Sequence, residues 1–181
     1  IKGQRYSFYS VRYNSEFQAN TNNLRNFYPT IAPLGDGYIF FWGEANFGNI
    51  YGRGYFSNST ARGNEFQITG GLYPQAASLI DGSAVVSWCS GDNVYVKRYS
   101  KNLIADASFR VNANTYQAGI SNVAGLVDGG FVVTWRENSN NNMYARRYRN
   151  DSTPYGAEFQ VNSNSLLNSL ISVGGLADGG Y

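Results

Sequence analysis

Hydrophobic and polar residues alternate with a period of two along most of the chain, and the apolar runs are short. Residues 122–135, for example, hold two apolar runs, rich in β-branched and aromatic side chains, on either side of Asp128 and Gly129. An Asp-Gly pair between such runs predicts a β-hairpin, because glycine readily adopts the positive φ of a tight turn. Turn-forming residues interrupt every run within about eight positions, and the apolar spacing is never that of a helix. The pattern therefore predicts an all-β chain.

The predicted hairpin recurs at a nearly constant distance, which indicates a repeat protein. Its turn aspartates are Asp36, Asp81, Asp128 and Asp178, which are 45, 47 and 50 residues apart. Each repeat has a third strand that ends in tyrosine, at residues 1–6, 50–55, 94–99 and 143–148. A fourth strand centred on phenylalanine follows, at residues 16–20, 65–69, 108–112 and 158–162. Each repeat is therefore predicted to contain four strands.

Four short strands at this period, with no sequence left for crossover helices, predict a β-propeller-like repeat of four-stranded antiparallel blades. The first strand of each repeat carries small residues, as the innermost strand must where the blades converge on the axis. One such column holds Ala32, Ala77, Ala124 and Gly174. A β-sandwich is the alternative, but it needs neither repeats this regular nor small residues always on one strand.

The repeats divide the chain into one domain, or a fragment of one, over residues 1–181. We expect blades at about 21–69, 70–112 and 113–162, with parts of blades at 1–20 and 163–181. The chain opens on a third strand and closes on a first strand just past its turn. A hairpin cut at this point favours a piece of a longer chain over a small closed ring.

Composition and charge narrow the range of partners. With 181 residues, of which 43% are hydrophobic and 16% aromatic, the chain has ample material for a core. Its 14 basic and 12 acidic residues are not clustered, so charge gives no case for nucleic acid or an anionic membrane. No apolar run approaches the roughly 18 residues of a membrane-spanning helix. The expected partners are therefore proteins or glycans at a surface, including further copies of the chain.

Few groups are available for catalysis. The chain has no histidine and one cysteine, Cys89, which excludes Ser-His-Asp and Cys-His catalysis and any intrachain disulfide. We interpret Cys89 as a packed thiol. Paired carboxylates, as in glycosidase-like propellers, are the remaining enzymatic option, with Glu44, Asp92 and Glu137 as candidates. Their loops differ in length and content and share no arginine cluster, so we predict no catalysis, no cofactor and no metal site.

Several recurring residues have a structural explanation. Aspartate before glycine at a hairpin tip tolerates the turn and hydrogen-bonds its backbone, which accounts for the repeated aspartates. The tryptophans that end each second strand fit blade-to-blade packing better than sugar stacking at the propeller mouth. These are Trp42, Trp88 and Trp135. Basic residues before the last tyrosine of the third strand predict a solvated edge that discourages association between sheets. They are Arg5, Lys97, Arg98, Arg146 and Arg147.

The loops of the predicted blades fall on two faces. Connections from the second to the third strand, and from blade to blade, emerge on one face, and the Asp-Gly hairpins emerge on the other. The first set varies in length and content, which is typical of loops that bind. The binding residues predicted there are Trp42, Glu44, Phe47, Asp92, Arg136 and Glu137. Asn58 and Asn150 begin N-glycosylation sequons on the hairpin side, where a secreted eukaryotic protein would accept a glycan.

Residues 158–162, 123–135 and 1–6 carry a family resemblance. They resemble tandem repeats of large secreted or surface proteins, many of them adhesin-like. Those repeats run roughly Glu-Phe-x-Val-Asn, Pro-x-Val-Ala-x-Leu-x-Asp-Gly-Gly-Phe-Val-Val-x-Trp and Ile-Tyr-x-Gln-Arg-Tyr. The resemblance implies an extracellular or cell-surface location and a structural or adhesive role, with a carbohydrate-binding propeller as the alternative. Family members often carry acidic loops after the tryptophan that indicate calcium, but here these loops hold few carboxylates, which argues against it.

Overall fold

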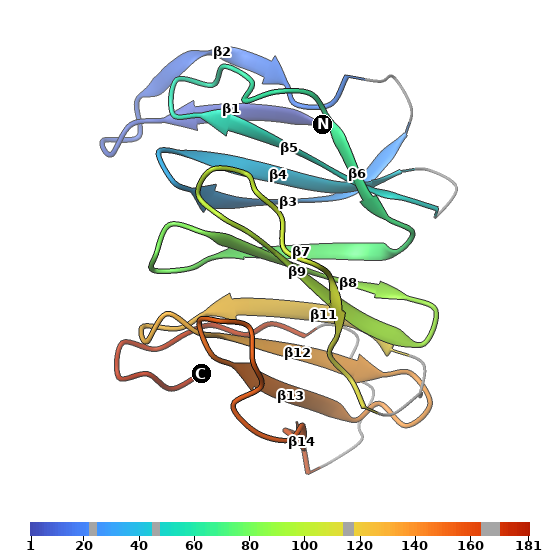
Figure 1. Cartoon of the computed structure of the whole chain (residues 1–181). Helices are drawn as coiled ribbons and strands as arrows, with labels where there is room; N and C mark the ends of the chain where they lie inside the picture. The colour runs from blue at the N-terminus through green and yellow to red at the C-terminus, as the bar shows by residue number, and fades with distance from the viewer. Residues whose placement is uncertain (22–24, 45–47, 114–117, 164–170) are drawn as a thin grey trace.

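The computed structural model describes residues 1–21, 25–44, 48–113, 118–163 and 171–181. The described residues form fourteen strands and no helix, and all strand pairs are antiparallel. Figure 1 shows the sheets following one another in chain order from the N-terminus to the C-terminus. The all-β prediction is confirmed.

Three of the sheets have four strands each, paired in sequence order. Blade 1 consists of β3 (Asn26–Leu34), β4 (Gly37–Glu44), β5 (Ile50–Phe56) and β6 (Phe66–Thr69). Blade 2 consists of β7 (Leu72–Ser78), β8 (Ala84–Ser90), β9 (Asn93–Tyr99) and β10 (Phe109–Arg110). Blade 3 consists of β11 (Ala118–Gly125), β12 (Phe131–Glu137), β13 (Met143–Tyr148) and β14 (Phe159–Gln160). A half-blade of β1 (Lys2–Tyr6) and β2 (Arg12–Gln18) precedes them.

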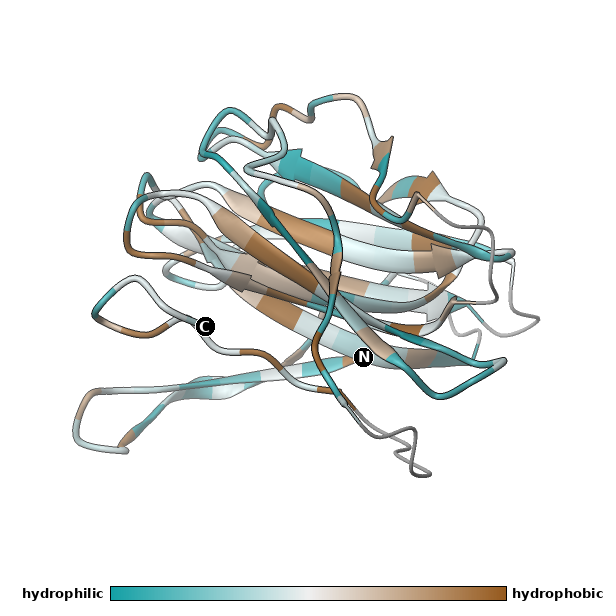
Figure 2. Cartoon of the chain, turned by 90° about the horizontal axis from the view of Figure 1, so that it is seen from below, coloured by the Kyte–Doolittle hydropathy of each residue, from teal (hydrophilic) through white to brown (hydrophobic). Residues whose placement is uncertain are grey.

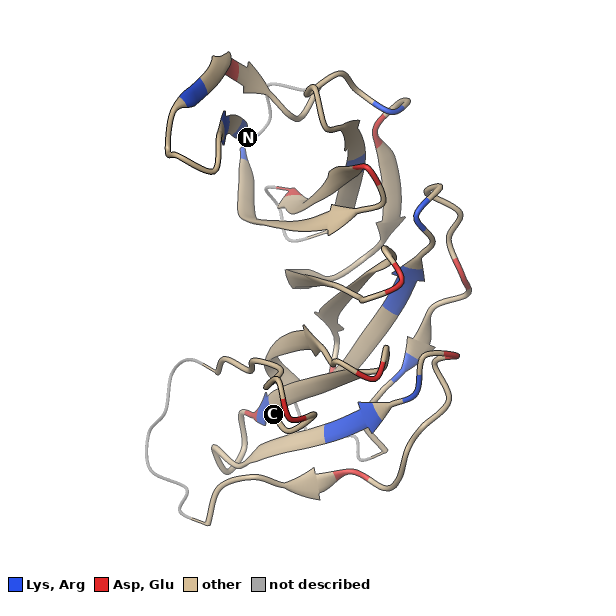
Figure 3. Ribbon diagram, turned by 90° about the vertical axis from the view of Figure 1, so that its left-hand side faces the viewer, with Lys and Arg blue, Asp and Glu red and all other residues tan. Residues whose placement is uncertain are grey.

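The first strands of the blades lie side by side, and the other strands fan outward from them. Strand β7 contacts β3 on one side and β11 on the other. In Figure 3 the sheets follow an arc that is open on one side. Successive sheets radiating from neighbouring inner strands define a β-propeller-like fold and not the two packed layers of a sandwich.

Small residues allow the inner strands to approach one another. A Cβ atom on Gly125 of β11 would lie 2.2 Å from the carbonyl oxygen of Ser78 at the end of β7. A Cβ atom on Gly175 would lie 2.3 Å from the carbonyl oxygen of Gly125. Real Cβ atoms do not come this close to a backbone oxygen, so the spacing of the inner strands depends on these glycines.

The hydrophobic core lies between successive sheets, and each tryptophan belongs to one of these interfaces. Trp42 packs with Ala19 and Tyr55 against the half-blade, and its side chain is fully buried. Trp88 joins the blade 1 residues in the next cluster, and Trp135 joins those of blade 2. In Figure 2 the central strands carry most of the hydrophobic colour. The predicted packing role of the tryptophans agrees with this burial.

The hairpin turns follow the predicted Asp-Gly geometry with one exception. Gly82, Gly129 and Gly179 have φ values of 80°, 87° and 89°, each directly after the turn aspartate. In blade 1 the glycine with positive φ is instead Gly35, which precedes Asp36. The reason is that Leu34 pairs with Gly37, which leaves a two-residue turn. The expectation that the glycine after the aspartate makes the turn is therefore wrong for this hairpin.

Candidate binding site

The loops at the ends of the strands remote from the Asp-Gly hairpins surround a hollow of about 660 Å³, which we call the loop-face hollow. Its walls come from the start of β7, the end of β8 with the turn that follows, the start of β11 and the end of β12. The polar side chains among its described lining are those of Tyr73, Ser90, Asp92, Arg136 and Asn138. Blades 2 and 3 therefore build most of one concave surface on the face where binding was predicted.

Two of the predicted binding residues meet at this hollow. Asp92 lies exposed in the turn after β8, and Arg136 lies half-buried at the end of β12. Glu44 lies at the end of β4, where its carboxylate accepts a hydrogen bond from Asn49 at 3.5 Å, and it is not part of the described lining. Phe47 lies outside the described residues. The structure thus brings together Asp92 and Arg136 but not Glu44.

Trp42 and Glu137 are buried within the protein, which corrects their assignment as binding residues. Trp42 has no exposed surface, because its ring packs between blade 1 and the half-blade. Glu137 is 3% exposed, and its Oε2 accepts a hydrogen bond from Asn140 Nδ2 at 2.6 Å. Its backbone N–H also donates to Asn142 O at 2.9 Å. Glu137 therefore holds the loop after β12 in place from within the protein.

Tyr73 lines the hollow and Tyr28 packs against it from outside the described lining, and neither was among the predicted binding residues. Tyr28 and Tyr73 occupy equivalent places near the start of β3 and β7, where the strand register shifts. Their φ values are 53° and 56°, and their rings meet edge to face at 4.6 Å between centroids. A bulky residue at positive φ costs about 1–3 kcal/mol, and a following proline adds to the strain. The recurring apolar-Tyr-Pro sequence, 27–29 and 72–74, was the signal that could have identified them.

Arg136 is held in position from the side of β11. Its Nη2 donates a hydrogen bond to Asn138 Oδ1 at 2.9 Å. Asn138 in turn lies against Gly119, where an added Cβ would approach Asn138 Oδ1 to 2.0 Å. The glycine therefore makes room for the amide that orients the guanidinium group in the wall of the hollow that Asp92 also lines.

Cys89 also lines the hollow, and its thiol is not activated. Burial raises the pKa of Cys89 to about 11, although Ser121 opposes this shift. Because the thiolate is the reactive form, the neutral thiol is a poor nucleophile at ordinary pH.

We expect alkylation of Cys89 in the native protein at about pH 8 to be at least about a hundredfold slower than in the urea-unfolded chain, because the raised pKa leaves little thiolate. Mass spectrometry of samples quenched over time would measure both rates. Equal rates would show that the thiol is accessible and ionised, contrary to this description.

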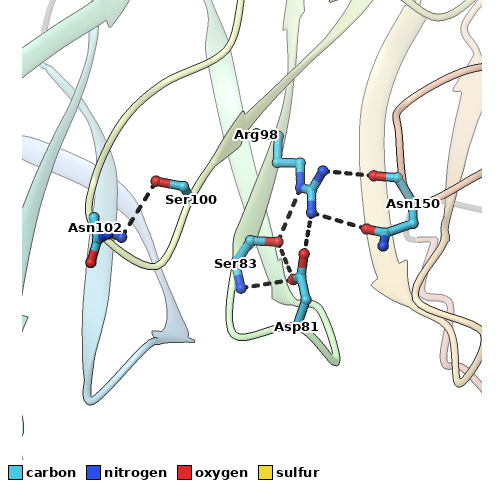
Figure 4. Close-up of polar contacts among 6 residues, drawn as sticks. All are labelled: Asp81, Ser83, Arg98, Ser100, Asn102 and Asn150. Carbon is cyan, nitrogen blue, oxygen red and sulfur yellow. Dashed lines mark hydrogen bonds and ion pairs between the residues drawn. The ribbon is translucent and has the colours of Figure 1, made fainter.

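The opposite face carries a polar cluster that joins blades 2 and 3 (Figure 4). Arg98 of β9 pairs with Asp81 of the hairpin in its own blade and donates from Nε to Ser83 Oγ at 3.0 Å. It also donates to Asn150 of blade 3, to the backbone oxygen at 2.6 Å and to Oδ1 at 2.9 Å. The hairpin aspartate, the arginine and the neighbouring turn therefore form one connection across the blade boundary.

Related ion pairs occur in the other blades. Arg147 pairs with Asp128 at 2.6 Å in blade 3. Blade 1 has Gly54 in place of this arginine, and Arg62 instead lies 3.4 Å from Asp36 and donates to Lys101 O of blade 2 at 3.0 Å. The prediction of a solvated basic edge is therefore wrong for Arg98 and Arg147, whose side chains bind hairpin aspartates.

The acid dependence of stability provides a test of the Asp81 cluster. Burial raises the pKa of Asp81, but the hydrogen bonds from Ser83 and the charge of Arg98 outweigh it, so the pKa lies below its ordinary value. A carboxyl with a lowered pKa in the folded state stabilises the protein above about pH 4, and this stabilisation is lost as the pH falls through the folded-state pKa.

We therefore expect Asp81→Asn to lower the free energy of unfolding by about 1 kcal/mol near pH 7 and by less at about pH 3. Urea titrations at the two pH values measure the difference. Asp106→Asn provides the control, since that carboxyl lies exposed in the loop after β9. An identical loss for Asp81→Asn at both pH values would contradict the assignment.

The two sequon asparagines lie exposed in turns after the third strands. Asn58 Oδ1 accepts a hydrogen bond from Thr60 Oγ1 at 2.6 Å. Asn150 offers its Oδ1 to Arg98, and an N-linked glycan, which attaches at Nδ2, would leave that oxygen in place. Both positions are therefore sterically open to the predicted modification.

Within the described part of the chain, no group of three or more potential metal ligands occurs. The described residues also include no helix that is long and apolar enough to cross a membrane.

Comparisons with known proteins agree with the class of fold. Neither a comparison with protein-family models nor one with curated proteins finds a match. Among solved structures, the chain is similar to the selenomethionine-substituted virginiamycin B lyase from Staphylococcus aureus, with a TM-score of 0.53 and 12% identity over 90% of this chain and 49% of that one. It is also similar to a catalytically inactive variant of that lyase with quinupristin, with a TM-score of 0.54 and 13% identity over the same shares. The chain thus spans about half the length of these proteins, and the likeness shows a propeller fold.

Proposed function

We propose that this chain is a non-catalytic binding module of an extracellular or cell-surface protein, with a structural or adhesive role, and that it holds a protein or glycan partner at the loop-face hollow. The observation that carries the proposal is the meeting of Asp92, Arg136 and Tyr73 at one concave surface. On the opposite face, Asp81 and Asp128 are engaged in ion pairs within their own blades. The proposal therefore places the partner at the loop face and not at these hairpins.

The arrangement of carboxylates supports binding over hydrolysis. Glycosidases use two carboxyl groups that flank the scissile bond. Among the described residues that line the hollow, Asp92 is the only carboxylate. Glu137 is buried against Asn140, and Cys89 is held as a neutral thiol. At 12% and 13% identity, the similar lyases give no reason to transfer their activity to this chain.

The extracellular location rests on the adhesin-like repeat motifs and on the exposed sequons. We expect material secreted from eukaryotic cells to carry glycans at Asn58 and Asn150, because both side chains lie exposed in turns. Peptide mass spectrometry before and after glycosidase treatment would show the modification, with Asn→Gln variants as controls. Unmodified Asn58 and Asn150 in secreted material would contradict this prediction.

Adhesion of protein-coated beads tests the proposed function. We expect beads that carry the chain to bind to cell monolayers or to beads carrying the same chain. The double variant Asp92→Ala, Arg136→Ala should reduce this binding by about tenfold, the effect of losing charged hydrogen-bonding groups. The matched variant Asp36→Ala, Arg62→Ala removes the same two charges from the hairpin face and should change binding by less than about twofold.

Circular dichroism melts of both variants would show whether each remains folded. Binding that is unchanged in the loop-face variant, or reduced equally in both variants, would contradict the proposed function. Absence of any adhesion would also contradict the proposed function.

A further inference from the structure

We infer that the ligand of the loop-face hollow is a neutral saccharide, which stacks on Tyr73 and binds through its hydroxyl groups to Asp92, Arg136 and Asn138. This inference rests on the proposed function and narrows it to one class of ligand. The hollow, at about 660 Å³, falls within the range of roughly 300–1,000 Å³ that is usual for small-ligand sites. It therefore suits a short oligosaccharide.

The aromatic wall is the first argument. Tyr28 and Tyr73 adopt the same costly backbone conformation in two successive blades, with φ values of 53° and 56°. Neither ring is fully used in packing, because Tyr28 remains 45% exposed and Tyr73 is half-buried. Strain of this kind persists where it serves a site. A tyrosine ring offers an apolar face and a polar tip, which complement the C–H face and the hydroxyl rim of a sugar ring.

The tryptophans cannot supply this platform. Trp88 and Trp135 are 1% and 3% exposed, and each packs between blades. In blade 3, Ile120 and not an aromatic residue lines the hollow at the start of β11. Among the described lining residues, the aromatic ring therefore comes from Tyr73 of blade 2, whereas Arg136 and Asn138 come from blade 3.

The polar wall is the second argument. The Asp92 carboxylate is an acceptor, the Arg136 guanidinium is a fork of donors, and the Asn138 amide is both. Vicinal sugar hydroxyls donate and accept in the same way, and hydrogen bonds to charged groups are the stronger kind. Asp92 and Arg136 together carry no net charge, which favours a neutral ligand over an anionic or cationic one. The 2.9 Å hydrogen bond to Asn138 holds Arg136 before the ligand arrives.

A glycan array probed with the whole chain, followed by calorimetric titration of the best neutral saccharide, tests the inference. We expect Tyr73→Ala to weaken binding by about tenfold and Tyr73→Phe, which keeps the ring, by less than about threefold. Asp92→Asn should weaken it by about tenfold through loss of the charged acceptor. Tyr73→Gly should also abolish stacking and should lower the melting temperature less than Tyr73→Ala does, because glycine adopts this φ freely.

The outcomes separate this inference from the proposed function. An array without bound saccharides, together with bead adhesion that still depends on Asp92 and Arg136, would overturn the saccharide and leave the proposed function standing. Saccharide binding that neither Tyr73→Ala nor Asp92→Asn weakens would place the sugar elsewhere and overturn the inference. Preference for charged saccharides would contradict the neutral ligand. Absence of both saccharide binding on the array and bead adhesion would refute both proposals.

If Tyr73→Ala does not fold, Asp92→Asn, at an exposed residue, tests the inference in its place.

Discussion

Addition of a single methyl group at Gly125 is expected to destabilise the protein by about 3 kcal/mol or more, at the upper end of overpacking effects. The new Cβ atom would lie 2.2 Å from the carbonyl oxygen of Ser78 in the neighbouring blade. This contact is with backbone, so β7 and β11 would have to separate along the innermost layer. Urea-induced unfolding of Gly125→Ala, followed by circular dichroism, measures the change.

Gly156→Ala is the matched control, since an added Cβ there meets nothing within 4 Å. We expect it to change the free energy of unfolding by less than about 0.5 kcal/mol. If the two substitutions have the same small effect, the inner strands do not approach as closely as described. The propeller arrangement of the blades would then be wrong in its most constrained layer.

The second large effect is expected for Trp88→Ala, which should cost about 3–5 kcal/mol. The ring is 1% exposed, packs in the cluster shared by blades 1 and 2, and stacks on Tyr95 at 5.9 Å between centroids. Trp88→Phe should cost less than half as much, because an aromatic ring still fills the interface. Thermal and chemical unfolding of both variants measure the costs. A loss below about 1 kcal/mol for Trp88→Ala would contradict its place in the core.

The repeated pattern of the sequence was sufficient to predict the class of fold. Alternation with a period of two, interrupted by Asp-Gly turns, predicted strands that the structure contains, and small residues marked the innermost strand. The turn at Gly35 could not be predicted from the local pattern. A hairpin with glycines on both sides of Asp36 can form its turn at either one, and strand pairing decides between them.

The candidate site was only partly predictable, for reasons that concern tertiary structure. Loop variation directed attention to Asp92 and Arg136, which the structure places at one hollow, but whether they meet depends on how blades 2 and 3 pack. Glu137 was listed as a binding residue, and Trp42 was listed as one beside its predicted packing role, because alternation does not say whether a side chain at a strand end points to solvent or to the preceding blade. Tyr73 was not among the predicted binding residues, and the register shift and positive φ at this position break the alternation that would have indicated where its side chain points.

The contacts of Arg98 with Asp81 and Asn150 could not be predicted from the sequence either. Adjacent basic residues on a strand indicated a solvated edge, because strand alternation places them on opposite faces. Which of them reaches a hairpin aspartate and a turn of the next blade depends on the spacing between blades. Long-range polar contacts of this kind carry no local signal that an alternating pattern could report.

Hydrogen–deuterium exchange with and without a bound partner or saccharide tests the central claim most directly. The account predicts that protection appears in the segments that line the hollow, residues 71–73, 90–92, 118–120 and 136–138. The hairpins that carry Asp36, Asp81 and Asp128 should exchange as they do in the free protein. Protection of those hairpins, with unchanged exchange around the hollow, would contradict the assignment of the binding face.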